Sequence, residues 1–195
     1  RQGGIIAVGV SEDDAVIAAE ITDGQGQVFL GTREGKAIRF KEQNVRPMGR
    51  IARGVRGINL RDQDEVVAMA VVRPGGTLLT VTENGYGKRT ELDEYRVQSR
   101  GGLGIISIHT SARNGRVAGI AYVENEDELM LITQQGKVLR MDTKDIRPIG
   151  RATQGVRLIE IDEQDLVVSL ARLVDVASDD EEEHADREPA PEAAG

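Results

Sequence analysis

Two basic loops of nearly identical sequence are the residues of this chain best suited to binding phosphate. They read Arg46-Pro-Met-Gly-Arg50 and Arg147-Pro-Ile-Gly-Arg151. An arginine guanidinium is a planar fork that matches phosphate oxygens, and a glycine lets the backbone approach them closely. The alternative interpretation is that these arginines pair with acidic turns of neighbouring repeats. The first interpretation predicts contact with phosphate groups.

The basic loops belong to a pattern that recurs every 50 or 51 residues. The arginines form three series with this spacing: Arg39, Arg89 and Arg140; Arg46, Arg96 and Arg147; Arg50, Arg100 and Arg151. The glycines Gly35, Gly85 and Gly136 keep it too. A fixed period of this length is typical of a repeat architecture. Similar basic loops on successive repeats would form a stripe that matches a long polyanion.

Each repeat contains four short segments rich in Val, Ile, Leu and Thr, which favour strands. They cover residues 27–32, 36–40, 55–60, 66–72, 77–82, 87–90, 104–109, 117–123, 128–133, 137–141, 156–161 and 166–172. Glycine at the end of each turn between the first two strands predicts a tight hairpin with positive φ. Four strands per repeat predict an all-β fold of radially arranged blades. Residues 4–10 and 15–21 match the back half of a repeat, so about three and a half blades are expected here, with others upstream.

Charge divides the chain into a body and a tail. The net charge is −8, and residues 175–195 contain nine acids against Arg187 alone, so the body of residues 1–174 is neutral. Within the body, bases cluster between Arg33 and Arg61, and acids precede the last strand of most repeats. Acids in such turns are expected to cap backbone donors. The tail has almost no large apolar side chain and is expected to be disordered, either competing with a polyanion for the bases or only maintaining solubility.

Several other features argue against catalysis and ligand binding. The chain has no Cys, and its aromatic content of 3% is low for a single-strand binder that stacks bases. The segment from Gly85 to Thr90 ends in Gly-Lys-Arg-Thr but lacks the glycine spacing of a nucleotide-binding loop. His109 and His184 have no companions at metal-ligand spacing. For the glycine-rich segment 98–104, a phosphate-binding loop and a turn with positive φ are equally consistent with the spacing.

Four longer phrases resemble one protein family. They are Val45-Arg-Pro-Met-Gly-Arg50, Ala52-Arg-Gly-Val-Arg-Gly57, Thr82-Glu-Asn-Gly-Tyr-Gly-Lys-Arg-Thr90 and Tyr95-Arg-Val-Gln-Ser-Arg-Gly-Gly102. In this order they resemble the C-terminal domain of the bacterial DNA gyrase A protein, over residues 1 to about 174. The family's box, Gln-Arg-Arg-Gly-Gly-Lys-Gly, is matched by residues 98–104 at five of seven positions, with Ser99 and Leu103 in place of bases. The resemblance implies that the complete box lies upstream.

The resemblance implies a six-bladed β-pinwheel whose blades exchange strands and whose basic rim wraps double-stranded DNA. It further implies a role in ATP-dependent negative supercoiling within a type IIA topoisomerase. The partners would be the rest of gyrase A and the gyrase B protein in a heterotetramer, in the bacterial cytoplasm at the nucleoid and away from membranes. No catalytic residue or cofactor is expected in this stretch, since ATP and magnesium would bind elsewhere in the holoenzyme. The two alternatives are the C-terminal domain of the topoisomerase IV A protein and a protein-interaction propeller that does not bind DNA.

On this basis, fifteen residues are expected to contact DNA. They are Lys36, Arg39, Lys41, Arg46, Arg50, Arg53, Arg56, Lys88, Arg89, Arg96, Arg100, Lys137, Arg140, Arg147 and Arg151.

Overall fold

The computed structural model describes residues 4–61 and 63–173, which form strands and three short 3-10 turns. The strands are β1 (Gln27–Thr32), β2 (Lys36–Lys41), β3 (Val66–Val72), β4 (Thr77–Thr82), β5 (Tyr86–Glu91), β6 (Ile105–Ile106), β7 (Val117–Val123), β8 (Glu128–Thr133), β9 (Val138–Asp142), β10 (Val156–Arg157) and β11 (Val167–Leu173). The 3-10 turns are η1 (Glu42–Asn44), η2 (Leu92–Glu94) and η3 (Thr143–Asp145). Each 3-10 turn directly follows the second strand of a hairpin.

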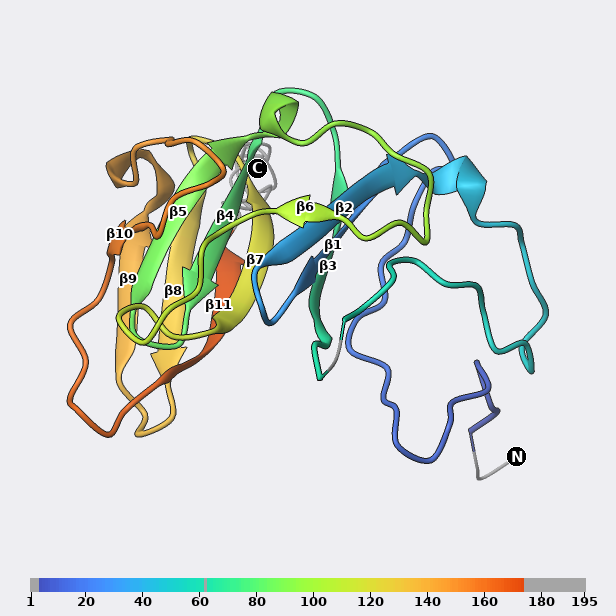
Figure 1. Cartoon of the computed structure of the whole chain (residues 1–195), viewed down its shortest axis with the longest axis horizontal. Coiled ribbons are helices and arrows are strands. Elements are labelled where there is room, and N and C mark those ends of the chain that lie inside the picture. The colour runs from blue at the N-terminus through green and yellow to red at the C-terminus, as the bar shows by residue number, and fades with distance from the viewer. Residues whose placement is uncertain (1–3, 62, 174–195) are drawn as a thin grey trace, which may run out of the picture.

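The strands form three antiparallel sheets, which are the blades (Figure 1). Their strand orders are β3-β1-β2-β6, β10-β5-β4-β7 and β11-β8-β9. Strands β6 and β10 come from the following repeat: β6 pairs with β2 through Ala37 and Ile105, and β10 pairs with β5 through Gly87 and Val156. Each of the first two blades is therefore completed by its successor, and the all-β pinwheel with exchanged strands is confirmed.

The hairpin turns follow the predicted chemistry. Gly35, Gly85 and Gly136 have φ angles of 80°, 78° and 89°, in the left-handed region that glycine adopts without strain. Acids before the last strand of the first and third repeats cap these turns. Asp64 Oδ1 accepts the Glu34 amide at 3.0 Å, and Asp165 Oδ1 accepts the Gln135 amide at 3.0 Å. The prediction that these carboxylates cap backbone donors in the turns is confirmed.

The exchanged segments also contact the hairpin turns of the blades that receive them. The Gly35 carbonyl accepts the Ser107 amide at 2.8 Å, and the Gly85 carbonyl accepts the Leu158 amide at 2.8 Å. A Cβ built on Gly85 would lie 2.5 Å from the Ile159 carbonyl oxygen, whereas one built on Gly136 meets nothing within 4 Å. Among the described residues, the third blade receives no exchanged segment.

The core is shared between neighbouring blades. The rings of Phe29 in β1 and Tyr95 after η2 meet edge to face, with centroids 5.1 Å apart. The Tyr95 hydroxyl is 2.8 Å from Ser107 Oγ, so this buried phenol is satisfied beside the exchanged strand. Strand β3 of the first blade contacts β7 of the second, which in turn contacts β11 of the third. Neighbouring blades therefore depend on each other for burial.

Several strand predictions are wrong in extent. Residues 4–10, 15–21 and 55–60 form no strand, because no other described segment offers them a ladder of hydrogen bonds. The predicted strands at 104–109 and 156–161 are reduced to two residues each. The residues that follow these two short strands leave the ladder and donate their amides to the hairpin turn of the receiving blade instead. The tail of residues 175–195, predicted to be disordered, lies outside the described residues.

Among the described residues, no helix is long and apolar enough to cross a membrane.

Candidate nucleic-acid interface

We call residues 46–50, 96–100 and 147–151 the rim loops. Each begins two residues after a 3-10 turn, and the three 3-10 turns line the upper edge of the molecule in Figure 1. Arg46, Arg96 and Arg147 open the three loops, and all three are exposed. Among the described residues, none of the three guanidinium groups has a hydrogen-bond or ion-pair partner. Unpaired arginines at the same position of successive repeats are available to an external anion.

The series Arg39, Arg89 and Arg140 does not belong to this interface. Arg39 is part-buried and donates to the carbonyl oxygens of Leu92 at 2.7 Å and Tyr95 at 3.1 Å. Arg89 is 3% exposed. Burial lowers the pKa of both guanidinium groups. In this structure neither guanidinium is available to an external anion, because each side chain crosses to the 3-10 turn of the next repeat. Arg140 is exposed but pairs with Glu128.

Lys88 is the most unexpected of the predicted contacts. Its side chain is fully buried, and its Nζ donates to the carbonyl oxygens of Gly150, at 2.8 Å, and Arg151. Burial, aided by the Arg151 charge, lowers its pKa from 10.5 to about 8. Lys88 therefore cannot touch DNA in this structure. Its equivalents in the other repeats are Ile38 and Leu139, and these apolar counterparts are the sequence signal for a core position.

The series Arg50, Arg100 and Arg151 is divided. Arg50 is exposed, with no side-chain partner among the described residues. Arg100 donates to the carbonyl oxygens of Asn44 at 2.9 Å and Arg56 at 3.0 Å. Arg151 donates to the Ile106 carbonyl at 2.5 Å. Arg50 therefore differs from the other two, whose guanidinium groups tie the rim loops to neighbouring backbone.

The glycine-rich segment 98–104 is a turn fixed against the preceding repeat. Gly101 and Gly104 have φ angles of 79° and 67°. The Gly101 amide donates to the Gly57 carbonyl at 2.6 Å. A Cβ on Gly104 would lie 2.6 Å from the Ala37 carbonyl oxygen. These contacts explain the glycines by backbone geometry and close packing, which favours the turn interpretation over a phosphate-binding loop.

Ion pairs remove other bases from the candidate interface. Lys137 pairs with Asp162 at 2.8 Å, and this hydrogen bond raises its pKa. Arg33 lies 2.5 Å from Glu65 and 2.7 Å from Glu83, and hydrogen bonds to both raise its pKa, with the Glu65 bond the larger cause. Both bases are therefore engaged within the hairpin turns. Eight predicted contacts are left without a side-chain partner among the described residues: Lys36, Lys41, Arg46, Arg50, Arg53, Arg56, Arg96 and Arg147.

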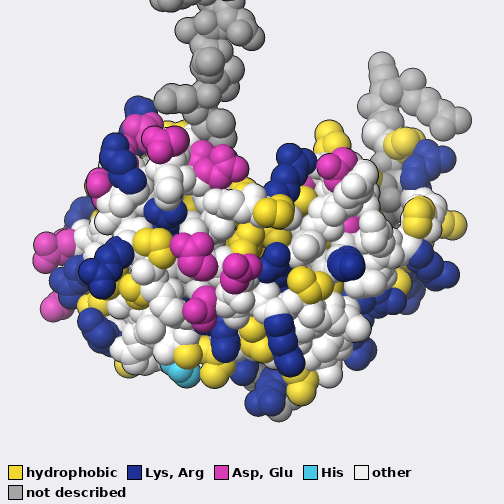
Figure 2. Space-filling model, turned by 90° about the horizontal axis from the view of Figure 1, so that it is seen from above, with side chains coloured by type: hydrophobic (Ala, Val, Ile, Leu, Met, Phe, Trp, Pro, Cys, Tyr) yellow, Lys and Arg dark blue, Asp and Glu magenta, His cyan; other side chains and the backbone are white. Residues whose placement is uncertain are grey.

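Figure 2 looks down on the edge that carries the 3-10 turns. Lysine and arginine side chains gather along its lower border and right side, and on its left side they alternate with acidic ones; other acidic side chains lie in the middle and at the upper left. A base that was not predicted, Arg61, is also exposed, and no partner of its side chain is found among the described residues. It was visible in the sequence only as one member of the basic cluster.

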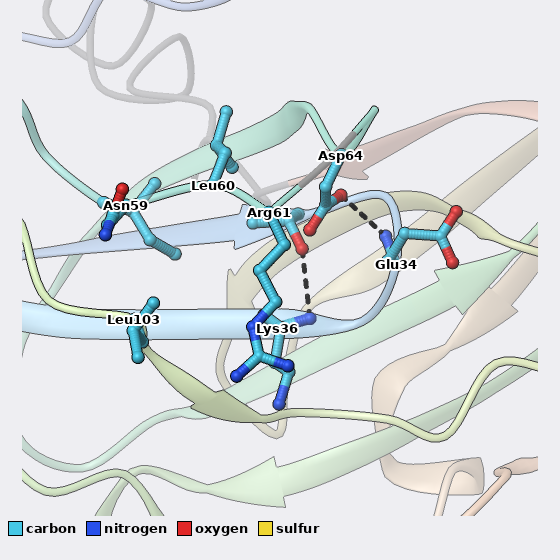
Figure 3. A pocket seen from close by; sticks show the side chains of 9 residues that line it. Glu34, Lys36, Asn59, Leu60, Arg61, Asp64 and Leu103 are labelled. Carbon is cyan, nitrogen blue, oxygen red and sulfur yellow. Dashed lines mark hydrogen bonds between the residues drawn. The ribbon is translucent and has the colours of Figure 1, made fainter.

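A small cavity of about 210 Å³ lies between Arg61 and Lys36 (Figure 3). Leu60 and Leu103 contribute apolar walls, and the Asp64 cap of the hairpin turn lies at one end. Ligand pockets for small molecules typically have about 300–1,000 Å³. This cavity is smaller, and its main feature is that two unpaired cations point to the same side of β2.

Comparison with known proteins places this geometry in a family. The sequence model described as "DNA gyrase C-terminal domain, beta-propeller" matches residues 1–23, 26–73, 76–124 and 127–173, one segment per repeat. The chain belongs to this family. Gyrase C-terminal domains have solved structures, and one titled "Structure of DNA gyrase A C-terminal domain" superposes with a TM-score of 0.82 at 29% identity, over 88% of this chain and 58% of that one.

Curated relatives carry the gyrase name too. The DNA gyrase A protein of Salmonella typhimurium is 46% identical over 93% of this chain, and that of Staphylococcus aureus is 44% identical over 94%. The chain spans about a fifth (21%) of the length of each. The C-terminal domain of a DNA topoisomerase IV also superposes with a TM-score of 0.82, at 26% identity over 86% of this chain and 52% of that one. The gyrase family resemblance is confirmed, and this stretch lacks the catalytic domain of a type IIA topoisomerase.

Proposed function

We propose that this gyrase-type domain binds duplex DNA along its rim loops and wraps it by phosphate contacts, without reading bases. The observation that carries the proposal is the series Arg46, Arg96 and Arg147, which are exposed, unpaired among the described residues and placed after a 3-10 turn in each of three blades. Evenly repeated cations suit a polyanion whose charge is also evenly repeated.

In the whole protein, this wrapping would direct the strand passage of a gyrase toward negative supercoiling. The support is family membership and the identity of 44–46% to the curated gyrase A proteins. The remainder of gyrase A and the gyrase B protein would be its partners in a heterotetramer in the bacterial cytoplasm. ATP and magnesium would act on those other parts. The domain of residues 1–174 would determine how the DNA is wrapped, and the tail of residues 175–195 would be a separate acidic segment.

The rim arginines should act on all duplexes alike. We expect Arg96→Gln to weaken binding to two duplexes of unrelated sequence by the same factor, because phosphate contacts carry no base information. Arg116→Gln is the matched control, since that exposed arginine pairs with Glu34 at 3.1 Å on the hairpin side. The measurement is the equilibrium affinity for both duplexes at fixed salt. A loss confined to one duplex, or an equal loss in the Arg116 variant, would contradict the proposal.

A further inference from the structure

Three consecutive residues of β5, Lys88, Arg89 and Thr90, all bond to the rim loop of the next blade or to the 3-10 turn before it. The Arg89 guanidinium donates to the carbonyl oxygens of Thr143 at 3.1 Å and Ile146 at 3.4 Å, immediately before Arg147. Together the three residues reach both ends of this short loop. We call Lys88, Arg89 and Thr90 the clamp.

The other two members of the clamp bond to the far end of the same loop. Lys88 Nζ donates to the carbonyl oxygens of Gly150 and Arg151, and Thr90 Oγ1 donates to that of Ile149 at 3.2 Å. The Ile149 amide in turn donates to the Arg89 carbonyl at 3.0 Å. Arg147 is thereby held between two fixed ends, although its own side chain is free of partners among the described residues.

The first blade offers a weaker version of the same arrangement. Ile38, Arg39 and Phe40 occupy the equivalent positions, so only the arginine has a polar side chain. Arg39 reaches the turn before Arg96, and its carbonyl accepts the Gln98 amide at 2.8 Å. A buried lysine in place of an aliphatic residue carries a desolvation cost. Its hydrogen bonds to the rim loop account for a lysine at this position, which core packing alone does not.

We propose that the clamp positions the rim loop of the following blade so that Arg147 is presented to the DNA backbone. This rests on the proposed function of the rim. Lys88 is then a positioning residue, which acts on DNA binding through the backbone of residues 147–151.

Lys88→Leu separates this role from a role in stability. Leucine is the residue of the third repeat at this position, and it removes a buried charge. The carbonyls of Gly150 and Arg151 lose the lysine as a donor, but each keeps a hydrogen bond from Thr153, through its hydroxyl and its amide. The stability of the variant should therefore equal or exceed that of the wild type at pH 7. The pKa of Lys88 in the folded protein, about 8, lies below the ordinary value of 10.5. The free energy of unfolding of the wild type should therefore rise relative to that of the variant as the pH increases from about 8 to 10.5. Arg151 and Glu94 are the charged groups that face Lys88 there.

The loop itself should loosen in this variant. Amide hydrogen exchange at Ile149 is expected to quicken by about tenfold in Lys88→Leu, since two hydrogen bonds to its loop are lost. Ile38→Leu is the matched control in the first blade, and exchange at Gln98 should not change in it. Unchanged exchange at Ile149 would overturn the proposal.

A double-mutant cycle tests the link to DNA, using the full chain and a duplex over a salt series. Lys88→Leu should lower the salt slope by up to about one, as Arg147→Gln does, and the double variant should bind like Arg147→Gln alone. Fully additive effects would overturn the positioning role. An unchanged slope in Arg147→Gln would instead contradict the rim interface, and the exchange at Ile149 would still decide whether the clamp exists.

Discussion

Replacing Gly85 with alanine should destabilise the protein markedly more than the same change at Gly136. Both glycines have positive φ, so each substitution should cost about 1–3 kcal/mol of backbone strain. Of the two, only Gly85 would place its new Cβ against the exchanged segment that follows β10, 2.5 Å from the Ile159 carbonyl oxygen. Displacing that segment should add about 1–3 kcal/mol. The measurement is the free energy of unfolding from denaturant titration.

Gly136→Ala is the control for this prediction, because its Cβ would meet nothing within 4 Å. The difference between the two variants isolates the contact with the exchanged segment from the strain of the turn. Equal destabilisation would mean that the exchanged segment does not press on the turn in solution. That result would count against segment exchange as the link between the second and third blades.

Replacing Arg89 with methionine should also be strongly destabilising. The guanidinium donates to Thr77 Oγ1 and to the carbonyl oxygens of Thr143 and Ile146, and all three partner residues are buried. The Thr143 carbonyl keeps the Ile146 amide as a donor, whereas Thr77 Oγ1 and the Ile146 carbonyl would lose theirs. Each buried acceptor left without a donor costs about 1–3 kcal/mol, so the loss should be on the order of 3 kcal/mol. These partners differ from those of Lys88, which lie on a more exposed loop. Thermal and denaturant unfolding should both report the loss.

Arg140→Met is the matched control in the third blade. Its guanidinium occupies the same register but pairs with Glu128 at an exposed site, where such pairs contribute less than about 1 kcal/mol. Comparable losses in the two variants would show that the contacts of Arg89 with the next repeat add nothing. A small loss in Arg89→Met alone would have the same meaning.

Much of the fold could be predicted because each repeat carries recognisable turn residues. The hairpin glycines and the acids that cap them obey local rules of φ and hydrogen bonding, so the roles of Gly35 and Asp64 could be inferred from sequence. The length of the third strand in each repeat could not be inferred, because the strand it pairs with belongs to another repeat. Residues 55–60 have strand composition but no partner strand among the described residues. Composition indicates a preference for strands, and pairing decides whether one forms.

The candidate site was harder to predict, because recurrence does not distinguish an external contact from an internal one. Arg46 and Arg39 recur with the same period, yet the first side chain faces solvent and the second crosses to the next blade. The composition of β5 predicted a strand with one exposed face, but both of its faces are buried, and Lys88 and Arg89 are buried with them. Aligning the repeats would have helped for Lys88, whose counterparts Ile38 and Leu139 are apolar.

The salt dependence of duplex binding tests the rim interface most directly. Log affinity falls with log salt by about 0.9 for each phosphate contact, so the triple variant Arg46→Gln, Arg96→Gln and Arg147→Gln should have a slope smaller than that of the wild type by about 2.7. The slopes should be measured on one duplex over the same salt range. A difference of about 2.7 is the result we predict. Identical slopes for the two proteins would contradict DNA binding by the rim loops.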